Sequence, residues 1–359
     1  MPAPRPSSSA LVALALCAAL AALGCERIQS RLIARAAHDA VTAPDHREWL
    51  EDGALHVVLC GTGSPLPSAE RAGPCTAILA GGHFLLVDAG PGANDRMGLL
   101  RLPRESIDAV LLTHFHSDHI GELGETAMQS WALGRPAPLP VYGPPGVEDV
   151  VAGFELAYAR DTRYRILHHG ADLMPPQARP LRAVPVTAPA EGEVVVFEDG
   201  PLRVSAFAVN HAPVTPAYGY RIDFSGRSVV LSGDTAPTDN LTAAARGADL
   251  LVHEALAAPL VEAAHVAAAE AGLERRARIA HDIQGYHTTP VQAAGIAKRA
   301  GVRLLVLNHL VPPPDNALLR RLFLRGVSDA WDGEVLLGED GMHFALPPGS
   351  EVIRREQLD

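Results

Sequence analysis

The sequence contains no run of lysines and arginines, and its 41 acidic residues outnumber its 30 basic residues, for a net charge of −11. A protein that binds a long polyanion normally needs a basic surface that displaces counterions from the phosphates. The composition therefore opposes strong binding of nucleic acid, and we expect no nucleic-acid partner. Repeats and low-complexity tracts are also absent, and 48% of the residues are hydrophobic, which predicts a globular protein with a sizeable core.

The N-terminus has an apolar stretch, but this stretch is too short to span a bilayer comfortably. It runs from Ala10 to Leu23 after Arg5 and has the length of a secretory signal. It ends in Ala22-Leu23-Gly24-Cys25, which resembles a bacterial lipoprotein cleavage site that leaves Cys25 acylated; plain cleavage and an uncleaved anchor are the alternatives. Residues 1–25 are therefore predicted to be a signal peptide. We expect an exported protein of the periplasm or cell envelope, with Cys25 as its potential membrane anchor.

Cysteine is scarce, with four in the chain. Cys17 and Cys25 fall in the predicted signal, which leaves Cys60 and Cys75. In an oxidising compartment these two can form a disulfide. Two buried thiols in adjacent strands fit the sequence equally well, because spacing alone does not establish a Cα separation that allows a bridge.

The most informative segment holds three histidines and an aspartate within six residues, directly after the apolar run 108–112. A loop that leaves a buried strand can direct alternate side chains into one pocket. His114 and His116 could therefore bind one cation, while Asp118 and His119 bind a second. This mixture of imidazole and carboxylate suits zinc first, with manganese or iron as alternatives.

The remaining chain is organised as a connector, one domain and a surface tail. Residues 26–53 are predicted to be the connector, with apolar side chains at helical spacing; 54–347 form the domain and 348–359 the tail. The β-prone runs are Leu55 to Cys60, Thr76 to Ala80, Phe84 to Asp88, Asp108 to Thr113, Val194 to Phe197, Leu202 to Val209, Tyr218 to Asp223, Ser228 to Leu231, Asp249 to Val252 and Val302 to Leu307. Helical spacing follows the histidine cluster as far as Gly134. Thr289, Pro290 and Gly301 mark the start and end of another helix. Residues 144–192 show no regular element. The pattern predicts two β-sheets between helical layers.

Four further residues lie where a predicted strand ends or a helix begins. His211, Asp234 and His309 follow apolar runs, and His287 precedes the helix at Pro290. Together with the cluster at 114–119, these residues resemble the metallo-β-lactamase superfamily over roughly Leu55 to Leu310. The resemblance implies an α+β fold, a four-layer αββα sandwich.

Residue by residue, the resemblance implies a site for two zinc ions. His114, His116 and His211 would hold one ion, and Asp118, His119 and His309 the other, with Asp234 bridging them. Two dications that share an anionic ligand generate hydroxide near neutral pH and bind the reacting group. In this family pattern the hydroxide would lie against Asp118 and Asp234.

Two more segments narrow the subgroup. The residues around Glu254 and those that follow His287 resemble paired motifs of ribonuclease Z and its arylsulfatase-like relatives. The resemblance implies that His287 is a general acid supported by Glu254, and that Asp88 orients a ligand histidine; a plain turn aspartate is the alternative for Asp88. Aspartate rather than cysteine at Asp234 makes antibiotic hydrolysis a poorer fit.

The chain departs from bacterial ribonuclease Z at one point. That family carries a tRNA-binding arm between the strand after the third ligand and the strand before the bridging aspartate, whereas here only Ser225-Gly226-Arg227 connects them. We therefore expect a dinuclear zinc hydrolase that acts on a small phospho- or sulfo-ester. The alternatives are a ribonuclease Z-type tRNA 3′-processing endonuclease and a non-catalytic metal-binding lipoprotein. The ester and the oligomeric state do not follow from the sequence.

Overall fold

The computed structural model describes residues 28–39 and 41–358 and divides the chain into two compact units, Met1–Asp45 and His46–Asp359. In the first unit residues 28–39 are helical, as their spacing predicts, and Ile28, Leu32 and Ile33 are exposed. The predicted signal peptide, with Cys17 and Cys25, lies outside the described residues. Among the helices that are described, none has the length and apolar character needed to cross a membrane.

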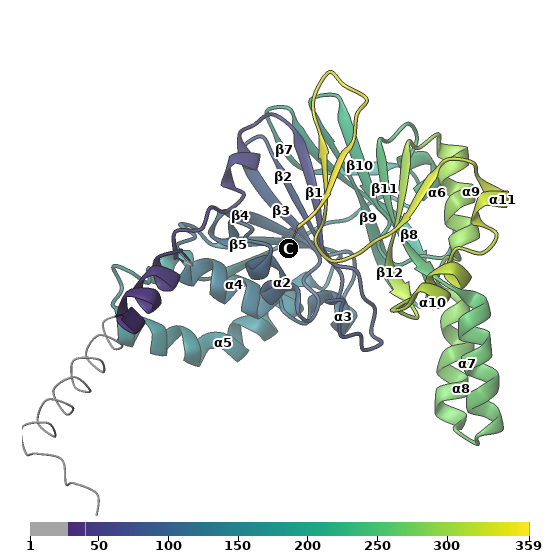
Figure 1. Ribbon diagram of the computed structural model, residues 1–359, viewed down its shortest axis with the longest axis horizontal. Coiled ribbons are helices and arrows are strands. Elements are labelled where there is room, and N and C mark those ends of the chain that lie inside the picture. The colour runs from purple at the N-terminus through teal and green to yellow at the C-terminus, as the bar shows by residue number, and fades with distance from the viewer. Residues whose placement is uncertain (1–27, 40, 359) are drawn as a thin grey trace, which may run out of the picture. The chain divides into compact units, whose positions relative to one another are not determined.

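The second unit contains two β-sheets that face each other (Figure 1). The strands of the first sheet lie in the order β15 (Arg354–Gln357), β14 (Met342–Leu346), β1 (Leu55–Gly61), β2 (Cys75–Ala80), β3 (His83–Val87), β4 (Ile107–Leu111), β5 (Leu139–Gly143) and β6 (Leu181–Pro185). The strands of the second lie in the order β13 (Glu334–Leu337), β12 (Leu304–Val311), β11 (Leu250–Leu256), β10 (Arg227–Leu231), β9 (Val214–Phe224), β8 (Leu202–His211) and β7 (Glu193–Asp199). Both sheets are mixed, with β3 to β6 parallel in one and β10 to β13 parallel in the other.

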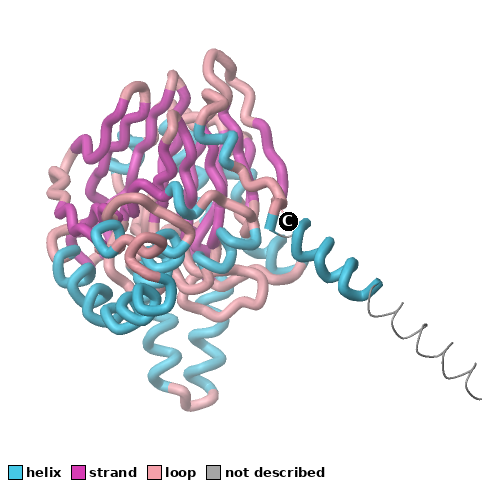
Figure 2. Tube along the Cα trace, turned by 90° about the vertical axis from the view of Figure 1, so that its left-hand side faces the viewer, coloured by secondary structure: helices cyan, strands magenta, loops and turns pink. Residues whose placement is uncertain are grey.

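Helices cover the outer face of each sheet (Figures 1 and 2). The first sheet packs against α2 (Ala93–Leu99), α4 (Leu123–Ala132) and α5 (Val147–His169), and the second against α6 (Asp239–Ala244), α9 (Pro290–Ala300), α10 (Ala317–Phe323) and α11 (Val327–Ala330). The other helical segments are α3 (Ser117–Ile120), α7 (Ala258–Glu270), α8 (Glu274–Asp282), η1 (Arg47–Leu50), η2 (Arg104–Ser106), η3 (Pro176–Ala178) and η4 (Ile283–Gly285). This arrangement confirms the expected αββα sandwich.

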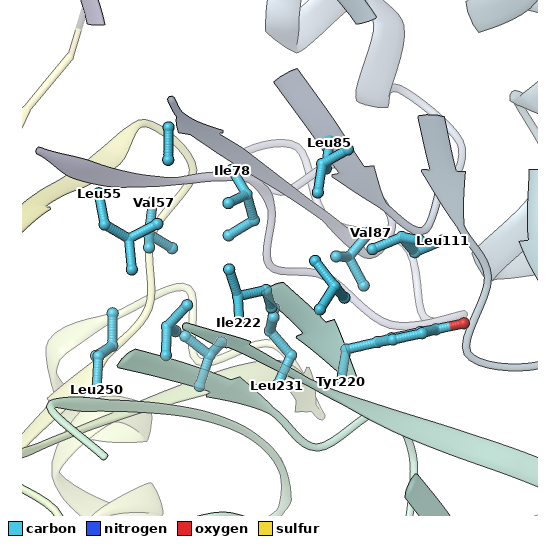
Figure 3. Packing of buried hydrophobic residues seen from close by; sticks show 14 of the residues in the cluster. Leu55, Val57, Ile78, Leu85, Val87, Leu111, Tyr220, Ile222, Leu231 and Leu250 are labelled. Atoms are coloured by element: carbon cyan, nitrogen blue, oxygen red, sulfur yellow. The ribbon is translucent and has the colours of Figure 1, made fainter. Parts of the chain in front are cut away.

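The space between the sheets is filled by branched aliphatic and aromatic side chains (Figure 3). Leu55, Ile78 and Leu85 from the first sheet meet Ile222 and Leu250 from the second, and all five are fully buried. Residues that alternate along a strand point to opposite faces, so each sheet contributes one face to this layer and the other to its helices. The sandwich holds the strand ends, and the loops that leave them, in fixed positions.

The predicted elements differ from the observed ones in several places. The stretch 144–192, without a predicted element, contains the long helix α5, η3 and β6. The single helix expected as far as Gly134 is divided into α3 and α4 at Gly121 and Glu122. Residues 354–357 of the expected surface tail pair with β14, and the compact unit begins at His46, inside the expected connector.

Cys60 and Cys75 form a disulfide between β1 and β2, with a Cα separation of 5.0 Å. The sequence left this bridge and a pair of free thiols as equal alternatives. Both residues are buried at the ends of their strands, where the 15-residue separation closes a loop. The bridge fixes this loop at the same edge of the sheet as the histidine cluster.

A second group of histidines lies where β1 pairs with β14. His56 Nδ1 and His343 Nε2 are 2.9 Å apart, and carboxylates flank the pair, Asp52 at 3.0 Å and Glu356 at 2.7 Å. Trp49 from η1 stacks on the His343 ring with centroids 4.0 Å apart. Both histidines are buried, so this chain of hydrogen bonds stabilises the pairing of β1 with β14.

Candidate metal centre

The first group of predicted ligands comes from the loop after β4 and from the end of β8. His114 Nε2 lies 3.0 Å from His116 Nδ1, and His211 Nε2 lies 3.4 Å from the same atom. The structure brings these three nitrogens within 4.8 Å of one another. His114 and His211 are buried, whereas His116 is exposed, so the group is reached from the side of His116. The Nδ1 of His211 donates to the backbone oxygen of Tyr286, which directs its Nε2 into the group.

The second group combines Asp118 and His119 from α3 with His309 from β12. The Oδ2 atom of Asp118 is 3.5 Å from His119 Nε2 and 3.2 Å from His309 Nε2. All three are buried. His309 has a φ of +43°, a backbone conformation that is unfavourable for a side chain larger than glycine. Such strain persists only where the surroundings hold it, and here it turns the imidazole of His309 toward Asp118.

Asp234 lies between the two groups. Its Oδ2 is 3.4 Å from His119 Nε2 and 3.3 Å from His309 Nε2, and its carboxylate also forms a group with His114 and His119. The buried atoms Asp234 Oδ1 and His119 Nε2 have no hydrogen-bond partner. Unpaired buried polar atoms are costly unless a cation completes their contacts. The structure thus brings all seven predicted ligands together in an arrangement that fits metal ions.

The carboxylate of Asp234 is held in its ionised form within the centre. Burial alone would raise the pKa of Asp234, but the nearby His309 and His119 outweigh it and hold the pKa well below its usual range. Burial also lowers the pKa of His114 well below its ordinary value, and the neighbouring His119 adds to this effect. A buried carboxylate surrounded by imidazole nitrogens is the donor set that zinc and related dications take.

Asp88 makes the contacts expected of a residue that orients a ligand. Its Oδ2 accepts a hydrogen bond from His119 Nδ1 at 2.8 Å, and its Oδ1 accepts one from the backbone N–H of Thr113 at 2.9 Å. The Thr113 hydroxyl adds a third bond at 2.9 Å. Asp88 has a φ of +60°, so this position is strained as well. With Nδ1 donating to Asp88, Nε2 of His119 faces the second group as a free ligand atom.

Glu254 and His287 form a buried pair beside the ligands. The Oε1 atom of Glu254 accepts hydrogen bonds from His287 Nδ1 at 3.1 Å, from the Thr288 N–H at 2.9 Å and from the Thr235 N–H at 3.2 Å. Burial alone would lower the pKa of His287, but Glu254 outweighs it, and the pKa rises to about 9. His287 also lies within 4.8 Å of ligand atoms of His211 and Asp234. A histidine held in this way can carry a proton next to the metal positions.

Two glycines allow the loops around the centre to approach closely. A Cβ atom on Gly90 would lie 2.2 Å from the backbone oxygen of Asp118, and one on Gly233 would lie 2.4 Å from the backbone oxygen of Tyr218. Gly233 also has a φ of +59°, which glycine adopts readily. Any larger residue would move the segments that carry Asp118 and Asp234.

Sequence reasoning missed several residues that position the site. Thr113, Thr235 and Thr288 are buried and hydrogen-bonded to Asp88 or Glu254, yet none was predicted as a site residue. The signal that could have identified them is their position directly beside a predicted functional residue. His253, the neighbour of Glu254 in the sequence, is also buried, with its Nδ1 near the backbone oxygen of Glu254.

Comparisons with known proteins identify the family to which the chain belongs. Residues 83–310 match the family described as Beta-lactamase superfamily domain. The ribonuclease Z of Mycobacterium sp. strain KMS is 40% identical over 297 residues, which cover 82% of this chain and 97% of that protein. The crystal structure of the short form of human tRNase Z shares 25% identity with a TM-score of 0.56, over 81% of this chain and 99% of that one. YhfI from Bacillus subtilis, a metallo-beta-lactamase fold protein, is 21% identical with a TM-score of 0.57, over the same shares of the two chains, and supports the fold.

Proposed function

Because the chain belongs to the metallo-β-lactamase superfamily, within the branch of its ribonuclease Z relatives, we propose that it is a ribonuclease Z-type endonuclease that cleaves RNA. It is a hydrolase of ester bonds. The observation that carries the proposal is the buried pair of Glu254 and His287 beside seven clustered ligands, in a chain 40% identical to a ribonuclease Z. The substrate class is a phosphodiester of RNA, with precursors of tRNA as the substrate that the names of the relatives indicate.

The expectation of a small-ester substrate and no nucleic-acid partner is wrong. Relatives aligned over most of this chain are named for cleavage of RNA, and the short human form is named for tRNA. The inference failed because net charge averages over the whole surface, whereas a nuclease binds its scissile phosphate through a local site. The short β9–β10 turn is as expected, with Phe224 paired to Arg227, but it does not identify the substrate.

Two divalent metal ions, zinc by the preference of these donors, would polarise the phosphoryl group and activate water when bound. His114, His116 and His211 would hold one, and Asp118, His119 and His309 the other, with Asp234 shared. The carboxylates of Asp118 and Asp234 lie on the same side of the centre as His309. There they can orient the attacking water by accepting its hydrogen bond.

His287 is proposed as the general acid. Glu254 fixes its Nδ1, so its Nε2 is the atom that can deliver a proton to the leaving oxygen. An alkoxide that leaves a ribose is a poor leaving group without that proton. A nitrophenolate leaves readily without one, so the role of His287 depends on the leaving group.

The test compares two substrates, a tRNA precursor with a 3′ extension and thymidine 5′-(p-nitrophenyl) phosphate. A general acid contributes about 10²- to 10⁴-fold. We therefore expect His287→Ala to lose at least about 100-fold on RNA and less than about tenfold on the nitrophenyl diester. His83→Ala is the matched control, since His83 also contacts two carboxylates, Asp108 and Asp199, but lies outside the site. Equal losses of activity on both substrates would contradict the role of His287 as general acid. Failure of the zinc-loaded wild type to cleave RNA would refute the proposed function.

We further propose export to the cell envelope. The predicted signal lies outside the described residues, and the support comes from the Cys60–Cys75 disulfide, since such bridges persist in oxidising compartments. Cell fractionation tests this proposal, with Cys25→Ser to separate lipid anchoring from plain secretion. Recovery of the wild type in the cytoplasm with an intact N-terminus would refute export.

A further inference from the structure

A cleft of about 780 Å³ opens beside the ligands His116 and His211. Its opposite wall consists of α7, α8 and the segment 283–286 that leads to His287. His116 is the exposed member of the first ligand group, so this cleft borders the side from which that group is reached. The seven ligands and His287 account for hydrolysis of a phosphodiester but leave this volume unused.

The wall opposite His116 is held firmly. The α7–α8 hairpin projects from the sandwich in both views (Figures 1 and 2), but its base is packed against the ends of β11 and β12. Leu256, Val261 and Val311 form this small buried cluster, with Ala280 and Ile283 packed on it. The cleft is therefore a preformed feature, as binding pockets for small groups usually are.

Tyr286 contributes an aromatic side chain to the lining of the cleft. Its ring centroid lies 5.2 Å from that of His211 and 5.0 Å from that of His287, and the two imidazole centroids are 5.2 Å apart. In such a triangle both imidazoles lie on the same side of Tyr286. The residue is partly exposed and lines the cleft, so part of its side chain can be reached by a ligand in the cleft. Pro213 and Val214 add apolar surface.

The rim of the cleft offers hydrogen-bond acceptors. Gln284 Nε2 donates to Glu262 Oε2 at 3.0 Å and to the Ala280 backbone oxygen at 3.2 Å. Among the described residues, no donor is bonded to the side-chain oxygen of Gln284. Asp282 also lines the cleft, but Arg278 contacts both of its carboxylate oxygens at 2.8 Å. An aromatic face with acceptors at its edge suits a flat heterocycle that carries an amino group.

We propose that this cleft binds one unpaired nucleobase next to the scissile phosphate, with Tyr286 as its stacking platform and Glu262 and Gln284 facing its edge. The inference rests on the proposed RNA cleavage. Adenine and cytosine carry an exocyclic amino group that these oxygens can accept from, whereas uracil does not. Tyr286 is in this view a positioning residue, because it sets where the RNA strand enters.

A binding experiment tests the cleft without turnover. The probes are AMP, CMP and UMP, with ribose 5-phosphate as the base-free reference, titrated by calorimetry into the zinc-loaded full chain. AMP and CMP should bind at least about tenfold more tightly than ribose 5-phosphate, and UMP more weakly than either. Tyr286→Ala should raise the Kd of AMP about 5- to 100-fold, the range for loss of one base–aromatic stack. Equal affinity of the wild type for AMP and ribose 5-phosphate would overturn the inference.

Turnover gives the second readout. On single-stranded oligoadenylate, Tyr286→Ala should raise KM far more than it lowers kcat, and Tyr286→Phe should restore KM to near the wild-type value. Tyr164→Ala is the matched control, since Tyr164 is exposed on α5 and does not line the cleft. A loss in kcat that Tyr286→Phe does not rescue would indicate a structural role and overturn the inference. If the wild type binds AMP through Tyr286 but cleaves no RNA, the base site is supported and the proposed function is refuted. If the wild type cleaves RNA but shows no base preference, the proposed function is supported and the base site is refuted.

Discussion

Replacing Asp88 by asparagine should weaken metal binding without unfolding the protein. Asparagine tolerates the φ of +60° at this position and can keep accepting from the Thr113 N–H, now 2.9 Å away. Its amide N–H₂ would then face His119 Nδ1, now 2.8 Å from Asp88, so two donors would meet. The clash between the two donors is relieved only if the proton of His119 moves from Nδ1 to Nε2, the atom that faces Asp118 and Asp234.

The expected loss of metal affinity follows from the position of that proton. A protonated Nε2 cannot bind a cation, and loss of such a supporting contact typically lowers metal affinity about 10- to 100-fold, or about 1.4 to 2.7 kcal/mol. The assay is competition with a chromophoric chelator, which resolves the weaker of two metal ions, together with a thermal melt. Asp249→Asn is the control, because Asp249 is a buried carboxylate that accepts from the Arg227 Nε and the Ser228 N–H away from the site. A folded Asp88→Asn protein whose two metal affinities stay within twofold of wild type would refute this account of His119.

Three further outcomes are expected. Burial, with the neighbouring His56, lowers the pKa of His343 to about 4 from 6.5. Stability present above pH 6.5 should therefore be lost as the pH falls toward 4, by at most about 3.5 kcal/mol at about 1.4 kcal/mol per pH unit. His343→Gln should reduce the difference between the urea midpoints at pH 7 and pH 5. Gly90→Ala should displace the Asp118 backbone and destabilise the fold by about 1 to 3 kcal/mol with weakened metal binding; unchanged melting would contradict the close approach. Thr289→Ala removes the capping box of α9 and should lower the free energy of unfolding by about 1 kcal/mol in urea titrations, leaving metal stoichiometry unchanged.

The site was predictable because its ligands follow strands. His211 ends β8, Asp234 follows β10 and His309 lies near the end of β12, so apolar runs followed by a polar residue marked them. The same rule located the cluster that begins at His114, after β4. Strand ends at one edge of a sandwich converge in space, which is why residues far apart in sequence form one centre.

The elements that the sequence did not reveal lack a periodic apolar face. In α5 only Val147 and Val151 are fully buried, while Leu156 and Leu167 are exposed on the same helix, so no helical stripe marks it. Residues 354–357 are all exposed and charged or amidic, and only their pairing with β14 makes them a strand. Such segments are ordered by contacts with distant parts of the chain, which a local pattern does not contain.

The acidic composition and the proposed RNA substrate are compatible once local and total charge are separated. Two divalent ions would bring four positive charges to a centre whose own ionised ligands are the carboxylates of Asp118 and Asp234, with the histidines neutral as ligands. The loaded centre is then locally cationic, whatever the net charge of −11. A phosphate held there and a base held against Tyr286 need few lysines or arginines, because stacking does not depend on charge. Binding that relies on so few phosphate contacts depends only weakly on salt, in contrast to proteins that track a long stretch of backbone. The composition thus constrains how RNA would be bound, through one phosphate and one base, more than whether it would be bound.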